Sequence, residues 1–204
     1  MPLPGRRSGA PVDWLIVGLG NPGSEYKGTP HNVGFEVAER LIDRWQLGKP
    51  KQRYRGLLAE GRTGVGPGHP RVAVLMPQTY MNEAGKSVGP ARGELRVELD
   101  RVLVVHDDID LPFGEIRVRL GGGLAGHNGL KSLKAALGGA DFRRVRIGVG
   151  RPPTTDPDRV AAYVLGKFRQ PRAEVEAVVE EGADAAERVL RDAEETSGVT
   201  ASGS

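Results

Sequence analysis

Short apolar runs, each followed by a polar segment, recur along this chain of 204 residues. Runs of roughly four to eight apolar residues bounded by turn residues are typical of buried strands. At 115–120 the pattern changes to alternation, with Ile116, Val118 and Leu120 separated by arginines, which is typical of a half-buried strand. The pattern predicts strands at 14–19, 53–61, 72–76, 101–106, 115–120 and 142–149.

Apolar residues recur at helical spacing between several of these strands. Val33, Val37 and Leu41 predict an amphipathic helix over 33–47, which Gly48 and Pro50 then end. The same spacing predicts helices at 82–90, 128–137 and 171–195, and three prolines predict a loop at 151–158. Strands that alternate with helices indicate an α/β fold with a central, mixed, mostly parallel twisted sheet flanked by helices. The close spacing of strands near 53–76 and 102–120 favours some antiparallel pairing.

The length of the chain fits one compact domain. We predict a single domain over residues 12–195, with disordered tails at 1–11 and 196–204. Cysteine is absent, which excludes disulfides, thiol chemistry and cysteine-ligated metals. No apolar run reaches the roughly 18 residues of a membrane span, and the N-terminal residues lack the apolar core of a secretory signal. We therefore expect a cytoplasmic protein that does not bind membranes.

The net charge of +3 hides an asymmetry along the chain. Residues 170–204 carry nine acidic and three basic side chains, a balance of −6, so residues 1–169 carry +9. Residues 112–151 alone contain eight Lys or Arg against two acids. Such a basic zone favours a polyanionic ligand, for which nucleic acid is the usual candidate. The alternative is a solvated basic face that only aids solubility.

Polar side chains suited to catalysis follow several of the predicted strands. Asn21 and His31 follow the first strand, Asn82 and Asp107 follow two later ones, and Asn128 lies beyond the strand at 115–120. Strand ends of this kind converge on one crevice in an open α/β sheet. A histidine with a pKa near neutrality can take a proton from water, so His31 is the candidate general base. The alternative for His31 is a capping role at the helix that follows it.

A carboxylate that accepts the Nδ1–H of an imidazole fixes its tautomer, and Asp107 is the candidate for this role. Turn or cap formation is the alternative, and it suits Asp108 and Asp110 better. The cluster from His106 to Asp110 also has some resemblance to a metal site. Alternate residues of an extended chain point to opposite sides, which argues against it.

Asn21, Asn82 and Asn128 are neutral amides, which donate and accept hydrogen bonds and so suit a peptide backbone. The alternatives are turn formation for Asn21 and helix capping for Asn82 and Asn128. The glycines of 121–126 precede a predicted helix, and backbone N–H groups at a helix start favour a phosphate. Lys131 and Lys134, one turn further on, strengthen that interpretation.

Four segments in this order, 18–34, 78–86, 106–112 and 121–131, resemble the bacterial-type peptidyl-tRNA hydrolase family. The resemblance runs from about residue 14 to 168. It implies hydrolysis of the ester between a peptide and the 3′-terminal ribose of tRNA, which recycles tRNA for translation. His31 would activate water, Asp107 would orient His31, and no cofactor or metal would be needed. The one Gly-x-Ser-x-Gly match, at residues 85–89, lies within the predicted helix at 82–90 and not at a turn from strand to helix, so a serine nucleophile is disfavoured. A monomer is expected.

The resemblance also assigns residues that contact the substrate. Asn21 joins the catalytic groups, while Asn82 and Asn128 bind substrate beside Tyr26 and Met81. Arg117, Lys131, Lys134 and Arg146 match the basic surface for the tRNA acceptor arm. The chain departs from the family pattern at Pro30, at Ala84 and at Leu124-Ala125. These departures bear on the loop and on substrate affinity, because no catalytic group is lost.

Two other interpretations remain. Residues 18–23 match the dinucleotide-binding pattern G-x-G-x-x-G, with Asp43 beyond it. In that motif a helix begins within the glycines, whereas here Pro22 and Pro30 delay the predicted helix to about residue 33. The second alternative is a non-catalytic RNA-binding protein on the same fold, for which a damaged site would be the signature.

Overall fold

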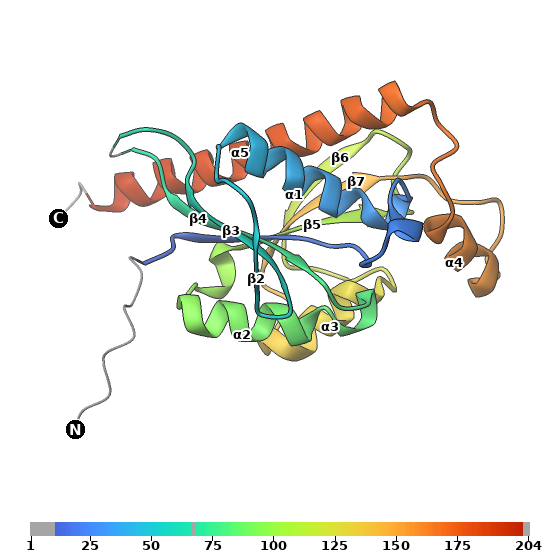
Figure 1. Ribbon diagram of the computed structural model, residues 1–204, viewed down its shortest axis with the longest axis horizontal. Helices are drawn as coiled ribbons and strands as arrows, with labels where there is room; N and C mark the ends of the chain where they lie inside the picture. The colour runs from blue at the N-terminus through green and yellow to red at the C-terminus, as the bar shows by residue number, and fades with distance from the viewer. Residues whose placement is uncertain (1–10, 67, 202–204) are drawn as a thin grey trace.

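The computed structural model describes residues 11–66 and 68–201, which form helices packed on both faces of one sheet (Figure 1). Helices α1 (Val33–Arg44) and α5 (Arg172–Ala201) cover one face. Helices α2 (Gly85–Leu95) and α3 (Asn128–Leu137) cover the other. This arrangement confirms the predicted α/β domain. Among the described residues, none of the helices combines the length and the hydropathy that a membrane span requires.

The described residues form a seven-stranded sheet in the order β2-β3-β4-β1-β5-β7-β6. The strands are β1 (Trp14–Gly18), β2 (Lys51–Arg53), β3 (Gly56–Arg62), β4 (Arg71–Pro77), β5 (Val102–Asp108), β6 (Ile116–Leu120) and β7 (Arg143–Gly148). The four central strands β4, β1, β5 and β7 are parallel to one another. The strands outside them pair antiparallel. Parallel pairing therefore defines the centre of the mixed sheet, and the carboxyl ends of its strands lie at one edge.

Alternating side chains of the central strands enter two separate cores. Trp14 and Ile16 of β1 pack in the core under α1 and α5. Leu15 and Val17 pack in the core under α2 and α3. All four are fully buried, as expected for a strand that is covered on both faces.

A close approach between α1 and the sheet requires glycine. A Cβ at Gly34 would lie 2.4 Å from the carbonyl oxygen of Val105 and 2.6 Å from the backbone nitrogen of Leu19. Only glycine allows the first turn of α1 to rest directly on the ends of β1 and β5. This contact brings the residues just before α1 next to the end of β5.

The structure contains a helix that the sequence pattern does not predict. Residues 151–158 are predicted as a loop, but α4 runs over Pro157–Leu165. Asp156 caps it by accepting the backbone N–H of Asp158 at 2.9 Å, and Pro157 takes the first position, where its missing N–H costs nothing. α4 lies at the end of the sheet rather than over a face (Figure 1).

Three other predicted elements differ in detail. The predicted strand 53–61 is a hairpin, because Tyr54 and Arg55 both have φ of +53° and form the turn between β2 and β3. The predicted helix 82–90 begins at Gly85, after a short 3₁₀ turn η3 (Met81–Glu83). Strand β6 is not half-buried as predicted, since Val118 and Leu120 are 51% and 53% exposed at the sheet edge.

The predicted tails are only partly covered by the described residues. Helix α5 continues to Ala201, through the first residues of the predicted C-terminal tail. Residues 202–204, and all but the last residue of the predicted N-terminal tail, lie outside the described residues.

Candidate active site

A cavity of about 630 Å³ opens at the carboxyl ends of the central strands. It is lined by groups from segments far apart in the sequence, including Asn21, His31, Met81, Asp107, His127 and Asn128. α4 supplies one wall through residues such as Val160 and Val164. The predicted convergence of strand ends on one crevice is therefore observed.

His31 and Asp107 form a direct hydrogen-bonded pair in this cavity. His31 lies in the 3₁₀ turn η2 (Pro30–Asn32) just before α1, and Asp107 lies near the end of β5. Nδ1 of His31 is 2.9 Å from Oδ1 and 3.0 Å from Oδ2 of Asp107. Burial lowers the pKa of His31, but the charge and hydrogen bond of Asp107 outweigh it, so the pKa is raised above the ordinary 6.5. Nδ1 donates to the carboxylate, which leaves Nε2 as the basic nitrogen.

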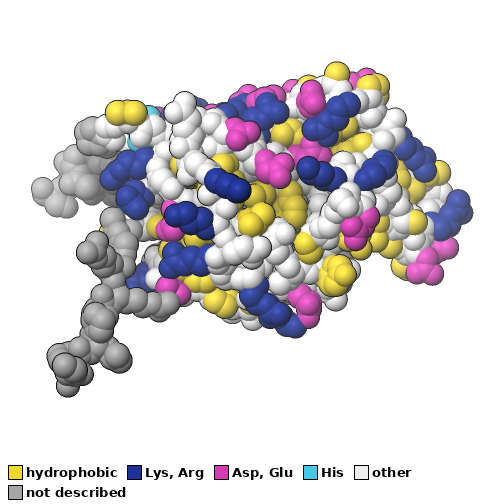
Figure 2. Space-filling model, in the orientation of Figure 1, with side chains coloured by type: hydrophobic (Ala, Val, Ile, Leu, Met, Phe, Trp, Pro, Cys, Tyr) yellow, Lys and Arg dark blue, Asp and Glu magenta, His cyan; other side chains and the backbone are white. Residues whose placement is uncertain are grey.

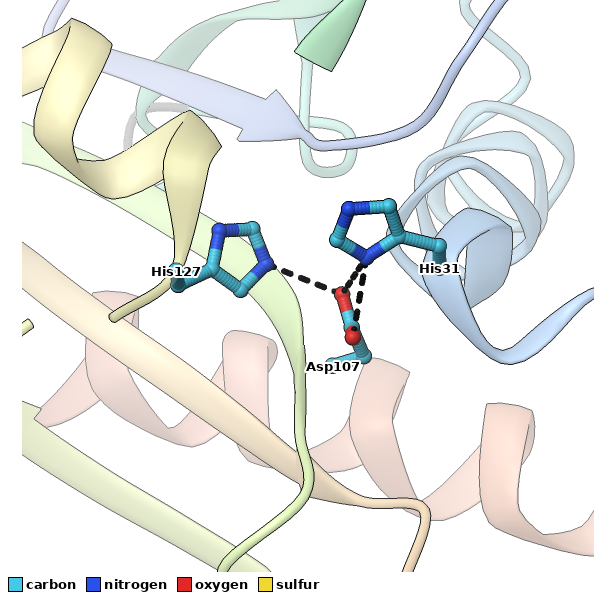
Figure 3. A group of neighbouring side chains, drawn as sticks. All are labelled: His31, Asp107 and His127. Carbon is cyan, nitrogen blue, oxygen red and sulfur yellow. Dashed lines mark hydrogen bonds and ion pairs between the residues drawn. The ribbon is translucent and has the colours of Figure 1, made fainter. Parts of the chain in front are cut away.

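Asp107 accepts a second hydrogen bond, from His127. Nε2 of His127 lies 2.9 Å from Oδ1 of Asp107, so two imidazole rings meet one carboxylate (Figure 3). Asp107 is 3% exposed, and its burial favours the neutral acid. The charges and hydrogen bonds of His31 and His127 overcome that effect and lower the pKa of Asp107. The carboxylate is therefore ionised throughout the physiological range.

His127 is a residue to which the sequence analysis gives no role. Its Nδ1 accepts the backbone N–H groups of Gly129 at 3.1 Å and Leu130 at 3.4 Å, which caps α3. Because Nδ1 is an acceptor, the ring proton is on Nε2, where it is donated to Asp107. The position of His127 immediately before a predicted helix is the sequence signal that indicates the cap.

His31, Asp107 and His127 also meet the spacing of a metal site, with one ligand atom from each within 4.8 Å of the others. Their hydrogen bonds oppose this use. A metal-bound histidine normally donates its second ring N–H, whereas Nδ1 of His127 accepts from the backbone. The metal cluster considered around His106 is not formed either. Asp108 instead pairs with Arg146 at 2.8 Å, and Asp110 pairs with Arg151 at 2.6 Å.

His106 precedes Asp107 and also lines the cavity, but it is almost fully buried, with 1% exposure. Its ring lies edge-on to that of His127, with 5.0 Å between ring centroids. Burial, with a further contribution from the neighbouring His127, lowers the pKa of His106 to about 3. His106 is therefore neutral at physiological pH and is unsuited to act as the base.

Asn21 is held by both its backbone and its side chain. Asn32 spans the backbone of Asn21 with two hydrogen bonds of 2.9 Å. Oδ1 of Asn21 accepts the backbone N–H of Met81 at 2.7 Å. Nδ2 has no partner among the described residues, so this donor remains available to a ligand in the cavity.

Asn82 and Asn128 line the same cavity and are both exposed. Neither is a helix cap. Tyr80 precedes the 3₁₀ turn of Asn82, and His127 caps α3 in place of Asn128. Met81 is buried in the cavity wall, whereas Tyr26 is not among the residues that line the cavity. The structure thus brings all of the predicted polar site residues together but leaves Tyr26 outside.

The predicted basic residues lie on two surfaces beside the cavity. Lys131 and Lys134 are exposed on α3 and border a shallow depression with Leu124. Arg117 of β6 is paired in register with Arg146 of β7, so the two side chains share one face of the sheet. The face shown in Figure 2 carries intermixed basic and acidic side chains.

Residues 18–23 do not form the dinucleotide-binding arrangement. In that arrangement a helix begins within the glycines, whereas α1 begins only at Val33.

Comparison with known proteins gives one consistent family. The sequence profile described as "Peptidyl-tRNA hydrolase" matches residues 15–202. A curated peptidyl-tRNA hydrolase of Mycobacterium sp. (strain KMS) is 49% identical over 177 residues, or 86% of this chain and 90% of the relative. That of Mycobacterium tuberculosis (strain H37Rv) is 48% identical over 178 residues, with the same shares. The crystal structure of the Acinetobacter baumannii enzyme superposes with a TM-score of 0.76 at 36% identity and covers 89% of this chain and 90% of that chain.

Proposed function

The chain belongs to the peptidyl-tRNA hydrolase family, and on that premise we propose that His31 is the general base of the reaction. The protein is a hydrolase whose substrate is peptidyl-tRNA. The observation that supports our assignment is the pairing of His31 Nδ1 with buried Asp107, since it leaves Nε2 free to accept a proton in the cavity.

In the proposed reaction, Nε2 of His31 takes a proton from water as the water oxygen attacks the ester carbonyl carbon. Asp107 stabilises the imidazolium that forms, as a buried carboxylate does in hydrolytic triads. The tetrahedral intermediate then expels the oxygen of the terminal ribose, which receives the proton from His31. Peptide and tRNA are released, and the histidine returns to its neutral form. An ester is an activated acyl compound, so no metal is required for this attack.

Asn21 is the proposed donor to the reacting carbonyl oxygen. Because Met81 fixes Oδ1 of Asn21, the amide is held in one orientation and its Nδ2 can serve a ligand. A preorganised donor of this kind stabilises the charge that develops on the oxygen in the transition state. Asn82 and Asn128, exposed at the rim, are the proposed contacts to the peptide backbone.

Arg117, Lys131, Lys134 and Arg146 are the proposed contacts to the tRNA acceptor arm. Arg146 is already paired with Asp108, so its contribution is smaller than that of the exposed Lys131. We further propose that the enzyme acts as a monomer in the cytoplasm. Sedimentation of the purified protein at the concentration used for assays tests the oligomeric state.

The proposed function is tested by hydrolysis of N-acetyl-aminoacyl-tRNA in the presence of a chelator. Wild-type protein should release the acyl group, while His31→Ala should lose about two to four orders of magnitude in kcat. His69→Ala is the matched control, because His69 lies at the exposed turn between β3 and β4. Equal activity of His31→Ala and wild type would refute the assignment of His31. If wild type binds tRNA without turnover, the non-catalytic RNA-binding alternative is correct.

A further inference from the structure

Arg144 of β7 is the only Lys or Arg that is buried among the described residues, with 2% exposure. Burial and the nearby charges of Arg146 and Arg119 lower the pKa of its guanidinium. A buried charge is costly unless it is paired with an opposite charge, yet Arg144 forms no ion pair with a carboxylate of the described residues. The arrangement therefore calls for a specific explanation.

The guanidinium of Arg144 is bound to the glycine-rich loop 121–126. One terminal nitrogen donates to the carbonyl oxygen of Gly123 at 2.9 Å. The other donates to the carbonyl oxygen of Gly121. Nε is buried and has no hydrogen-bond partner within the described chain. Two carbonyls two residues apart match the fork of a guanidinium, which the single ammonium of a lysine does not reproduce.

The loop has few other restraints. Gly121, Gly122 and Gly126 have positive φ, and so does Ala125, which is a strained conformation for alanine. The first residue of the loop is tethered by Gly121 N–H to the carbonyl of Phe142 at 3.0 Å. The other end is tethered by His127 N–H to the carbonyl of Leu124 at 2.9 Å. Between these two bonds, the restraints are the hydrogen bonds from Arg144 and the packing of Leu124 against the core under α2 and α3.

The end of this loop delivers two residues to the active site. His127, the next residue, caps α3 and donates to Asp107. Asn128 follows and lines the cavity, as do Leu124, Ala125 and Gly126 of the loop itself. A shift of the loop would therefore displace a hydrogen-bond donor of Asp107 and a proposed substrate contact together.

We propose that Arg144 is a positioning residue for hydrolysis: it fixes the glycine-rich loop so that His127 and Asn128 meet Asp107 and the substrate. This inference rests on the proposed function for its kinetic consequences. The two hydrogen bonds from Arg144 to the carbonyls of Gly121 and Gly123, which we call the clamp, are present in the free protein. Arg144 lies in the lining of the cavity, but it acts through Gly121 and Gly123: these two carbonyls take both of its terminal nitrogens, and its Nε is buried.

The test compares Arg144→Lys and Arg144→Met with Arg188→Met, which removes an exposed cation on α5. Both Arg144 variants should lose about tenfold to a hundredfold in kcat, as for a misplacement of about 1 Å in an active site. KM should change by less than about threefold, since no substrate contact is removed. Arg188→Met should match wild type in both constants.

Nitrogen NMR of the protein labelled with ¹⁵N-histidine supplies a readout that does not depend on activity. In wild type, His127 should show a protonated Nε2 and an acceptor Nδ1, and this signature should be lost or mixed in the Arg144 variants. Folded variants with wild-type kcat and an unchanged His127 signature would overturn the proposal. A rise in KM alone, with weaker salt dependence, would instead make Arg144 a tRNA contact.

Arg144→Met leaves a buried gap and is the variant more prone to unfold, so Arg144→Lys decides the question in that case. A folded lysine variant with full kcat refutes the need for the two-carbonyl clamp. If wild type itself proves inactive on N-acetyl-aminoacyl-tRNA, the proposed function fails, but the histidine spectra still confirm or refute the clamp.

Discussion

Asp107 receives the ring N–H groups of two histidines that have different second partners. His31 presents its other nitrogen to the cavity, whereas His127 uses its own to cap α3. The same carboxylate thus joins a proposed base to a helix terminus. At the scale of single residues, the consequence is that the protonation of His31 depends on Asp107, while the tautomer of His127 is fixed by the backbone.

Replacement of Asp107 by asparagine should move the pH dependence of the reaction. Asp107 raises the pKa of His31 against the effect of burial, so in wild type the acid limb of kcat/KM should lie above the ordinary histidine value of 6.5. Without the charge of Asp107, the effect of burial on the pKa of His31 dominates, so the acid limb should shift to lower pH. The maximal kcat should fall by about two to four orders of magnitude. A pH series of kcat/KM measures both effects. If the acid limb has the same midpoint in the variant as in wild type, the limb reports the titration of a group other than His31.

Replacement of Asn21 by aspartate isolates the proposed donor. Aspartate keeps an oxygen that can accept the Met81 N–H, but it replaces Nδ2 with a second oxygen. We expect kcat to fall by about a hundredfold to a thousandfold, as for removal of one oxyanion donor. Thermal unfolding of the variant provides the control for folding. A KM increase with unchanged kcat would show that Asn21 only binds substrate.

The sequence is sufficient to predict which chemically distinctive residues meet in the cavity, but less sufficient to predict the residues that support them. His31, Asp107 and the three asparagines follow predicted strands, so their convergence is expected from topology alone. His127 is missed because its role depends on the rotation of one ring between a helix end and a carboxylate. Tyr26 is predicted at the site, yet the fold of the loop after β1 leaves it outside the cavity lining.

At the scale of elements, the first turn of α1 sets the position of His31. Gly34 rests against the backbone of Val105 and Leu19, so a methyl group has no room there. Gly34→Ala should destabilise the protein by about 1–3 kcal/mol through overpacking. It should also lower kcat by at least tenfold, because η2 and His31 move with the helix.

Gly93→Ala is the matched control for that substitution. Gly93 lies within α2, and a Cβ there would meet nothing within 4 Å. Alanine at this position should stabilise the protein by about 0.5–1 kcal/mol and leave kcat unchanged. Thermal or urea unfolding of the two variants measures the contrast. If Gly34→Ala and Gly93→Ala both have the unfolding free energy of wild type, the close approach of α1 to the sheet does not require glycine at position 34.

Local patterns explain which elements were predictable. The buried central strands carry clear apolar runs and α3 carries a helical period, and these elements appear where expected. α4 was missed because the prolines of 151–158 favour a loop, although Asp156 and Pro157 are also a good helix start. The exposure of β6 was missed because alternation shows that one face is polar, but not whether a helix covers the other.

At the scale of the whole molecule, the acidic helix α5 and the basic residues of α3 lie on opposite faces of the sheet. The acids of α5 pair with α1: Arg44 contacts Asp184 at 2.7 Å, and Arg40 and Arg44 both contact Glu180. These pairs place much of the acidic charge against the helix on the opposite face of the sheet from α3. The basic residues around α3 therefore remain available to a polyanion.

Substrate binding should weaken steeply as salt rises, because phosphate contacts release condensed counterions. Lys131→Ala should raise KM more than it lowers kcat, and it should reduce the slope of log KM against log salt by about 1. Lys51→Ala, at the exposed edge strand β2, serves as the control. Equal losses in kcat and kcat/KM for Lys131→Ala would contradict a role in tRNA binding.

The way in which His127 is capped bears on inhibitor design. Three imidazoles line the cavity; of these, His127 accepts backbone N–H groups of α3 with its Nδ1 lone pair, and His106 is buried. Nε2 of His106 also lacks a partner but is buried, so within the described residues His31 is the histidine that presents an accessible, unshared ring nitrogen to the cavity. An electrophilic compound shaped to this cavity would therefore react at a single atom, Nε2 of His31, and its site of attachment could be verified by peptide mass spectrometry.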